Sequence, residues 1–130
     1  MTRPGYGFGR TVASPYGEVV ERVRGALKEE GFGVITEIDV KATMNEKLGR
    51  DVAPYVILGA CNPGYAHQVL EADPELGLFL PCNVIVYEAA DGTHVSAVDP
   101  EAMIGLSGNQ GLAQIAAEVK ARLMRVVQRL

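Results

Sequence analysis

A predicted β-hairpin near residue 90 constrains the fold of this chain more than any other feature. Residues 82–89 (CNVIVYEA) and 93–98 (THVSAV) have the composition of two short strands, and Asp91-Gly92 lies between them. Asp-Gly is a preferred pair for a tight hairpin turn, because both residues tolerate the positive φ angles that such a turn requires. The two strands are therefore expected to pair antiparallel, and they favour a largely antiparallel sheet.

Three further strands are predicted upstream of the hairpin. Residues 5–13, with Tyr6, Phe8 and Val12, form the first. Residues 33–40 alternate apolar and polar side chains, as a half-buried strand does. Residues 55–61 (YVILGAC) are apolar on both faces, which indicates a strand in the centre of the sheet.

The predicted helices have apolar residues at three- and four-residue spacing, so each has one apolar face. Most begin with a capping residue followed by proline, a pair that suits the first turn of a helix. These starts are Ser14-Pro15, Asn62-Pro63, Asp73-Pro74 (a short extra turn) and Asp99-Pro100. The predicted spans are 15–31, with Gly31 as the left-handed stop, then 41–49, 63–72, 99–103 and 112–130. Cations near the end of the last helix suit its dipole; they are Lys120, Arg122, Arg125 and Arg129.

Together these elements predict one α+β domain over residues 1–130. The order β-α-β-α-β-α-β-β-α predicts a two-layer sandwich, in which helices cover one face of a mainly antiparallel sheet. A sheet covered on one face leaves apolar surface exposed, and residues 55–61 show no polar alternation. A second copy of the chain would cover such surface, so we expect a homodimer.

Composition excludes several classes of function. The chain has 130 residues, and 12 Lys and Arg against 16 Asp and Glu give it a net charge of −4. Nucleic-acid binding is not expected, because it requires a basic surface. We also expect no membrane contact and a cytoplasmic location, since residues 1–10 lack the apolar core of a secretory signal and no apolar stretch could span a bilayer. The sequence has no Ser-His-Asp pattern, its 105–111 loop matches no phosphate-binding motif, and it identifies no cofactor.

Two cysteines mark the candidate site. Cys61 ends the predicted central strand immediately before a helix N-terminus, where the helix dipole and free N–H groups stabilise an anion such as a thiolate. Cys82 opens the next strand, and each cysteine is followed by an asparagine, Asn62 and Asn83, as an amide donor. Residues 74–81 are long enough to return the chain to the end of the sheet that holds Cys61, so the two thiols can share a site.

Three interpretations of the cysteines remain open. They form a shared reactive or ligand-binding site, they are inert core residues, since free cysteine usually packs as a small hydrophobe, or they bind a metal. Metal binding is the least favoured of the three, because Cys61, Cys82 and His67 lack a fourth protein ligand, so we assign no metal ligand. His67 remains a candidate ligand-binding residue in the helix after Cys61. Lys41 is another, either as a cation facing a bound anion or as a solvated charge.

Seven segments of the chain together form a recognisable pattern: 30–33 (EGFG), 38–43 (IDVKAT), 59–63 (GACNP), 66–67 (AH), 70–78 (LEADPELGL), 80–84 (LPCNV) and 99–103 (DPEAM). In this combination the chain resembles the bacterial and archaeal family "domain of unknown function 302". The resemblance covers essentially the whole chain. It implies a small two-layer α/β domain, similar in topology to one repeat of the TATA-binding-protein fold, and a dimer, but it implies no activity.

Two functional hypotheses follow. In the first, the chain is a small soluble binding or redox module that uses Cys61 and Cys82, with Asn62 and Asn83 beside them, on a small-molecule or anionic ligand. In the second, it is a non-catalytic homodimeric interaction domain, in which these residues only shape turns. Thiol reactivity in the folded protein discriminates between the two, because buried structural thiols resist alkylation. The sequence names neither the ligand nor a catalysed reaction.

Overall fold

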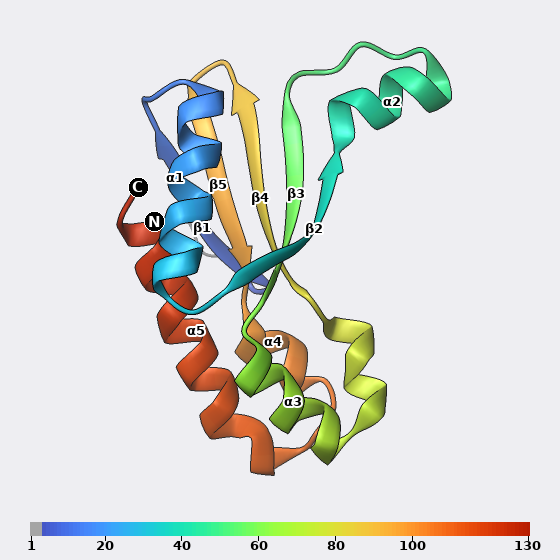
Figure 1. Cartoon of the computed structure of the whole chain (residues 1–130), viewed down its shortest axis with the longest axis vertical. Helices are drawn as coiled ribbons and strands as arrows, with labels where there is room; N and C mark the ends of the chain where they lie inside the picture. Colours follow the sequence, from blue (N-terminus) through green and yellow to red (C-terminus); the bar gives the residue numbers. More distant parts are fainter. Residues whose placement is uncertain (1–3) are drawn as a thin grey trace.

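The computed structural model describes residues 4–130 of the chain, and it confirms the predicted α+β fold (Figure 1). Five strands form one antiparallel sheet in the order β1-β5-β4-β3-β2. The strands are β1 (Gly7–Val12), β2 (Gly33–Asp39), β3 (Tyr55–Cys61), β4 (Cys82–Ala89) and β5 (Gly92–Val98). The helices are α1 (Tyr16–Glu29), α2 (Val40–Leu48), α3 (Pro63–Ala72), α4 (Pro100–Gly105) and α5 (Ala113–Gln128), with the 3₁₀ turns η1 (Pro74–Phe79) and η2 (Gln110–Leu112).

The hairpin forms at the predicted place, but the two residues of its turn are Ala90 and Asp91 instead of Asp91 and Gly92. Among the described residues only glycines have a positive φ, so Asp91 does not adopt the expected conformation. Ala89 pairs with Gly92 at its tip, and Gly92 has a φ of 134°. On its far side β5 pairs with the first strand of the chain, and β4 pairs with β3. The antiparallel sheet is therefore built out from this hairpin in both directions.

Some predicted helix boundaries need correction. Pro15 occupies the N-cap position of α1, and the Ser14 side chain accepts a hydrogen bond from Arg22 instead of capping the helix. Asp39 caps α2 by accepting from the backbone N–H of Ala42, so this helix begins one residue earlier than predicted. The last helix begins one residue later and ends at Gln128.

The main core lies between one face of the sheet and the helices α1 and α5. Alternate residues of the central strands are buried there, which is the pattern expected of a half-covered sheet. From β4 these residues are Cys82, Val84 and Val86, and from β3 they are Val56, Leu58 and Ala60. Leu27 of α1 and Leu123 of α5 are fully buried against them.

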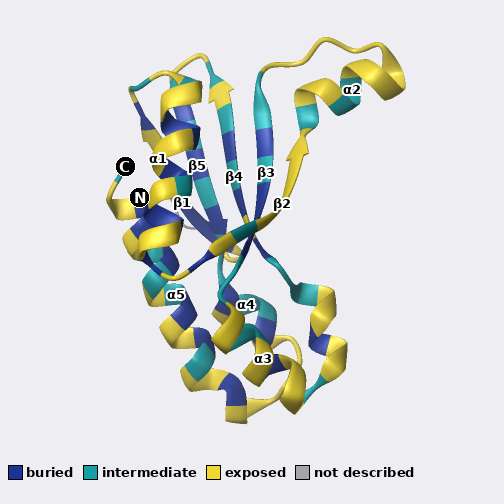
Figure 2. Ribbon diagram, in the orientation of Figure 1, coloured by how far each residue is buried: buried dark blue, intermediate teal, exposed yellow. Residues whose placement is uncertain are grey.

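A smaller apolar cluster holds together the helices beyond one end of the sheet. It consists of Val69, Leu76, Ile104, Leu112 and Ala116, contributed by α3, η1, α4, η2 and α5. Figure 2 shows that the helices at this end of the molecule combine buried segments with exposed ones. This cluster fixes α3 against the ends of the strands, which is where Cys61 and Cys82 lie.

The helix α2 differs from the others, because none of its residues is buried. It projects from the body of the molecule beyond the end of β2, whose residues are also mostly exposed (Figures 1 and 2). Within residues 4–130, no helix has both the length and the apolar character needed to cross a bilayer. The predicted absence of a leader concerns residues 1–10, of which residues 1–3 lie outside the described part of the chain.

Candidate functional site

A cavity of about 280 Å³ lies at the end of the sheet, between α3 and the strands β2, β3 and β4. Its lining is almost entirely apolar and includes Ile35, Tyr65, Leu70, Leu80 and Pro81. Cys61, Asn62 and Cys82 line the same cavity. We call it the cysteine cavity.

Strand register brings the two cysteines to one end of the sheet. Ala60 pairs with Cys82 across β3 and β4, so Cys61 lies one residue further along β3. Their environments differ, because Cys82 is buried whereas Cys61 is partly exposed. Burial raises the pKa of the Cys82 thiol to about 11, and the neighbouring Cys61 adds to this rise. Cys82 is therefore a neutral thiol at pH 7, and Cys61 is the more accessible of the two.

Asn62 does not cap α3 with its side chain, which corrects the expectation from the Asn-Pro pair. It occupies the N-cap position, but its Nδ2 donates to the backbone carbonyl of Glu30 over 3.4 Å. The backbone turns sharply at the acceptor, since Gly31 has a φ of 85° and lies close to the Asn62 amide. Asn62 thus connects the end of α1 to the start of α3 at the edge of the cavity.

A β-bulge in β2 supplies one wall that sequence alternation did not predict. The register between β2 and β3 shifts between Val34 and Thr36, so Ile35 has no partner on β3. A bulge turns a side chain away from its regular position, and here Ile35 lines the cavity while it is 62% exposed. On β3 the approach of Thr36 and Pro81 requires glycine, because a Cβ on Gly59 would lie 2.0 Å from Thr36 Oγ1.

A buried carboxylate lies beside the cavity, and sequence analysis missed it. Glu30 is only 5% exposed, and both its oxygens accept hydrogen bonds from Arg125. Arg129 pairs with the same carboxylate, and Arg122 donates to the Glu30 backbone carbonyl. Arg122 also stacks over the ring of Tyr65 in the cavity wall. The arginines of the last helix therefore have a specific partner in Glu30, in addition to the helix dipole.

The remaining predicted site residues lie away from the cysteine cavity. Asn83 lies one residue after Cys82 and lines a groove on the uncovered face of the sheet. His67 is exposed on α3 and faces Glu71 of the same helix. Lys41 donates to the Asp51 carboxylate and to the Val52 carbonyl, so it connects the first turn of α2 to the loop that follows this helix. The cavity therefore unites Cys61, Asn62 and Cys82 but not the other three candidates.

The described residues form no cluster of the kind that binds a metal ion. Among residues 4–130, no group of three or more His, Cys, Asp or Glu side chains could hold a metal ion. The cavity offers two thiols and one amide, and its other lining groups are apolar or aromatic. This arrangement suits contact with an apolar molecule better than coordination of a cation.

The geometry fits the family that the sequence segments indicated. Residues 8–130 match the family described as "Domain of unknown function DUF302". The chain belongs to this family. It is also similar to the crystal structure of an uncharacterised conserved DUF302 protein from Bacillus stearothermophilus, with 34% sequence identity and a TM-score of 0.89. That similarity covers 97% of this chain and 98% of the other, whereas no curated protein matches the chain.

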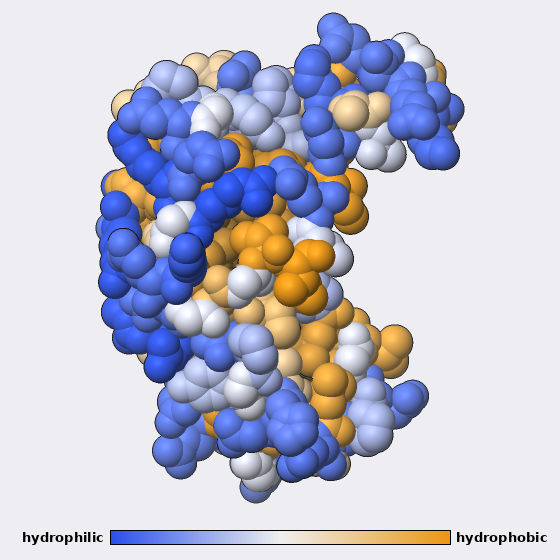
Figure 3. Space-filling view, viewed as in Figure 1, coloured by the Kyte–Doolittle hydropathy of each residue, from blue (hydrophilic) through white to orange (hydrophobic). Residues whose placement is uncertain are grey.

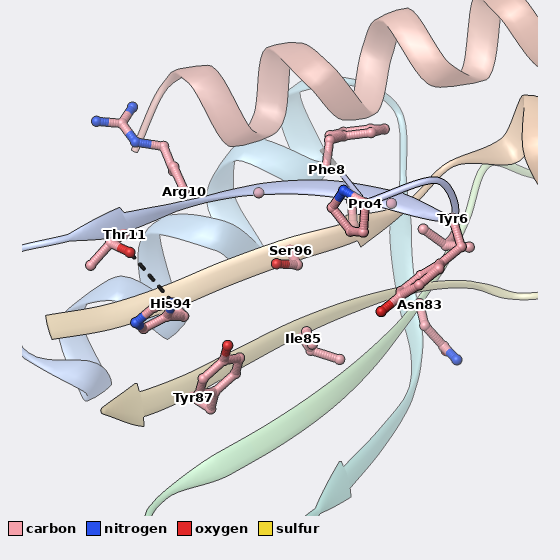
Figure 4. A pocket seen from close by; sticks show the side chains of 14 residues that line it. Pro4, Tyr6, Phe8, Arg10, Thr11, Asn83, Ile85, Tyr87, His94 and Ser96 are labelled. Carbon is pink, nitrogen blue, oxygen red and sulfur yellow. Dashed lines mark hydrogen bonds between the residues drawn. The ribbon is translucent and has the colours of Figure 1, made fainter. Parts of the chain in front are cut away.

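The uncovered face of this DUF302 sheet holds a second, wider groove of about 530 Å³. Figure 4 shows Ile85, Tyr87, His94 and Ser96 on this face, whereas Phe8 points to the helix side of the sheet. The ring of Tyr87 stacks on His94, whose Nε2 lies 2.7 Å from the Asp91 carboxylate. The groove is more open and more polar than the cysteine cavity, and its floor is a regular strand surface.

Proposed function

We propose that this protein binds a small, mainly apolar molecule in the cysteine cavity. The observation that supports the proposal is the cavity itself, because its volume is near the lower end of the ~300–1,000 Å³ typical of ligand sites and its lining is nearly all apolar. Such sites combine an apolar wall with a few polar groups that orient the ligand. Cys61 and Asn62 have that role in the proposal.

The chemistry of Cys82 favours binding over a dithiol redox function. A thiol with a pKa of about 11 is almost entirely protonated at neutral pH, and the thiolate is the form that attacks a disulfide. Cys82 therefore serves in this proposal as a weakly polar part of the wall. Cys61 provides the accessible sulfur at the side of the bound molecule.

The test uses toluene and indole as probes, followed by changes in the backbone amide NMR signals of the intact chain. The proposal expects saturable shifts at Ala66 and Leu80 in the wall and unchanged signals at Ser96 on the opposite face. An Ala66→Phe variant should abolish the shifts, because the added ring fills the cavity. The matched control Ala117→Phe places the same ring on an exposed position of α5 and should leave binding intact.

Two outcomes would overturn this proposal. One is the absence of saturable shifts in the cavity wall with both probes at millimolar concentration. The other is undiminished binding by a folded Ala66→Phe variant, which would place the bound molecule elsewhere.

A second candidate function is self-association as a homodimeric interaction domain. It is favoured by the exposed apolar surface, since eight large apolar side chains of the described chain remain exposed. Burial of such surface against a second copy is the usual reason that small domains pair. Light scattering coupled to size-exclusion chromatography tests it, and a monomer mass at micromolar concentration would exclude it.

A further inference from the structure

The helix α2 and the loop after it form an arm that projects from the body of its own chain. We define the arm as residues 40–52; its helix has nine residues, none of them buried. A helix this short is marginal in water unless an apolar face packs against something. Leu48 of the arm is 67% exposed and Val52 is 37% exposed, and Ile38 at the end of β2 is 48% exposed beside it. These side chains are available to a partner molecule.

On the other side of the cysteine cavity, α3 and η1 form a lobe, which we define as residues 63–79. Leu78 of the lobe is 82% exposed, and Leu70 is also exposed. The arm, the lobe and the adjoining residues Ile35 and Ile38 of β2 account for six of the eight exposed large apolar side chains of the described residues. The exposed apolar surface is therefore concentrated around one hollow.

Figure 3 shows the shape that this arrangement produces. The arm and the lobe project on either side of a hollow, and apolar surface lines the hollow between them. A rotation of 180° about an axis at the mouth of the hollow brings the arm of one copy opposite the lobe of another. The same rotation places the second arm opposite the first lobe, so one symmetric contact is made twice.

The arm and the lobe carry net charges of opposite sign. The arm has a net charge of +1, from Lys41, Lys47 and Arg50 against Glu46 and Asp51. Asp39, just before the arm, directs its carboxylate to the start of α2, where it accepts from the N–H of Ala42. The lobe has a net charge of −3 and contains no Lys or Arg; its acidic residues are Glu71, Asp73 and Glu75. Complementary charge orients two partners and disfavours the contact of lobe with lobe.

We propose that a second copy of this chain docks on the hollow, with the arm of each protomer against the lobe of the other. This inference rests on the self-association proposed above and adds the surface that mediates it. Leu48 at the end of α2 and Leu78 at the tip of the lobe are the expected apolar contacts. The partner's arm would then lie across the mouth of the cysteine cavity.

The experiment compares the dimer affinity of the intact chain with that of two charge variants, by light scattering and sedimentation. Leu48→Glu places an acid against the acidic lobe, and Leu78→Lys places a base against the basic arm. Because each homodimer contains the change twice, each variant should raise the dimer Kd by about 100-fold or more. Leu106→Glu is the matched control, since Leu106 is 72% exposed but lies outside both the arm and the lobe. This variant should leave the dimer affinity unchanged.

Mixing the Leu48→Glu and Leu78→Lys variants provides the sharpest result. In a mixed dimer the acid introduced on one protomer's arm lies against the base introduced on the other protomer's lobe, and the second contact keeps the original residues. The mixture should therefore regain dimers that neither variant forms alone. Failure of the mixture to form dimers, or an equal loss of affinity with Leu106→Glu, would overturn the arm-and-lobe contact.

The parent chain separates failure of this interface from failure of self-association itself. A monomeric parent chain would overturn both. A dimer that survives both charge variants but dissociates on Tyr6→Glu would retain self-association and move it to the uncovered sheet face, which overturns the arm-and-lobe contact alone.

Discussion

Replacement of Glu30 by glutamine tests how this fold holds its last helix. The Glu30 carboxylate, only 5% exposed, accepts hydrogen bonds from Arg125 over 2.9–3.2 Å and from Arg129 over 3.0 Å. Glutamine keeps the shape of the side chain but removes the charge and turns one acceptor oxygen into an amide donor. That donor would face a guanidinium group, which can only donate.

The size of the expected stability loss depends on how exposed the arginine partners of Glu30 are. A hydrogen bond to a charged group contributes ~1.5–3 kcal/mol, and removal of one partner of a fully buried pair costs ~3–5 kcal/mol. Here Arg125 and Arg129 are 50% and 42% exposed, so water can solvate them after the substitution. We therefore expect Glu30→Gln to lower the free energy of unfolding by about 2 kcal/mol at pH 7. For a chain of this length that corresponds to a fall in Tm of roughly 6–8 °C.

The effect should depend on pH with a defined sign. The hydrogen bonds from Arg125 lower the pKa of Glu30 in the folded protein, and they outweigh the opposing effect of burial. A carboxyl whose pKa is lower in the folded than in the unfolded state stabilises the protein above its unfolded value and loses this contribution as pH falls through its folded value. The difference between parent and variant should be constant above about pH 5 and shrink at lower pH.

Urea denaturation between pH 3 and pH 7 measures both quantities. The control is Glu29→Gln, because Glu29 pairs with Arg129 as well but is 70% exposed. That exposed pair should contribute less than ~1 kcal/mol. Equal losses for the two variants, or a Glu30→Gln loss that stays constant down to pH 3, would refute the conclusion that the buried ion cluster stabilises the fold.

Two further predictions concern the candidate site and the helix starts. In single-cysteine variants at pH 7, Cys61 should react with iodoacetamide, whereas Cys82 should react only as fast as the protein opens, because it is buried and its pKa is raised to about 11. Equal rates for the two thiols in folded protein would contradict this. Asp99→Ala should cost ~1–2 kcal/mol of stability, because its carboxylate accepts from the N–H groups of Glu101 and Ala102 at the start of α4 and also pairs with Lys120. Asn62→Ala should cost less, since it loses one long hydrogen bond, and chemical denaturation showing the reverse order would contradict this ranking.

The sequence alone was sufficient for the elements whose cause is local. The Asp91-Gly92 pair predicted the antiparallel hairpin, because a tight turn involves residues only a few positions apart, although Ala90 and Asp91 form the turn and Gly92 opens β5. Asp99 was predicted as a helix cap for the same reason, and the N–H groups that it caps lie two and three residues away. The resemblance to DUF302 rests on such local segments, and the match over residues 8–130 confirms it.

The candidate site required the tertiary structure, because its neighbours are distant in the sequence. Chain length allowed Cys82 to return beside Cys61, but only the pairing of Ala60 with Cys82 places both on one cavity. Asn83 lines the groove on the uncovered face instead, since successive residues of a strand point to opposite faces and its neighbour Cys82 faces the core. The cavity brings together Cys61, Asn62 and Cys82, and the sequence could not distinguish these from the three candidates that lie elsewhere.

Glu30 is the clearest example of a feature that the sequence alone could not predict. In the sequence it is one of two glutamates at a helix end, where a solvated charge is the ordinary expectation. Its arginine partners lie 95 and 99 residues further along the chain, and Asn62 reaches its carbonyl from 32 residues away. Local preferences determine where helices, strands and turns form, but the burial of a charge and the polar groups that surround it are decided only when α1, α3 and α5 pack together.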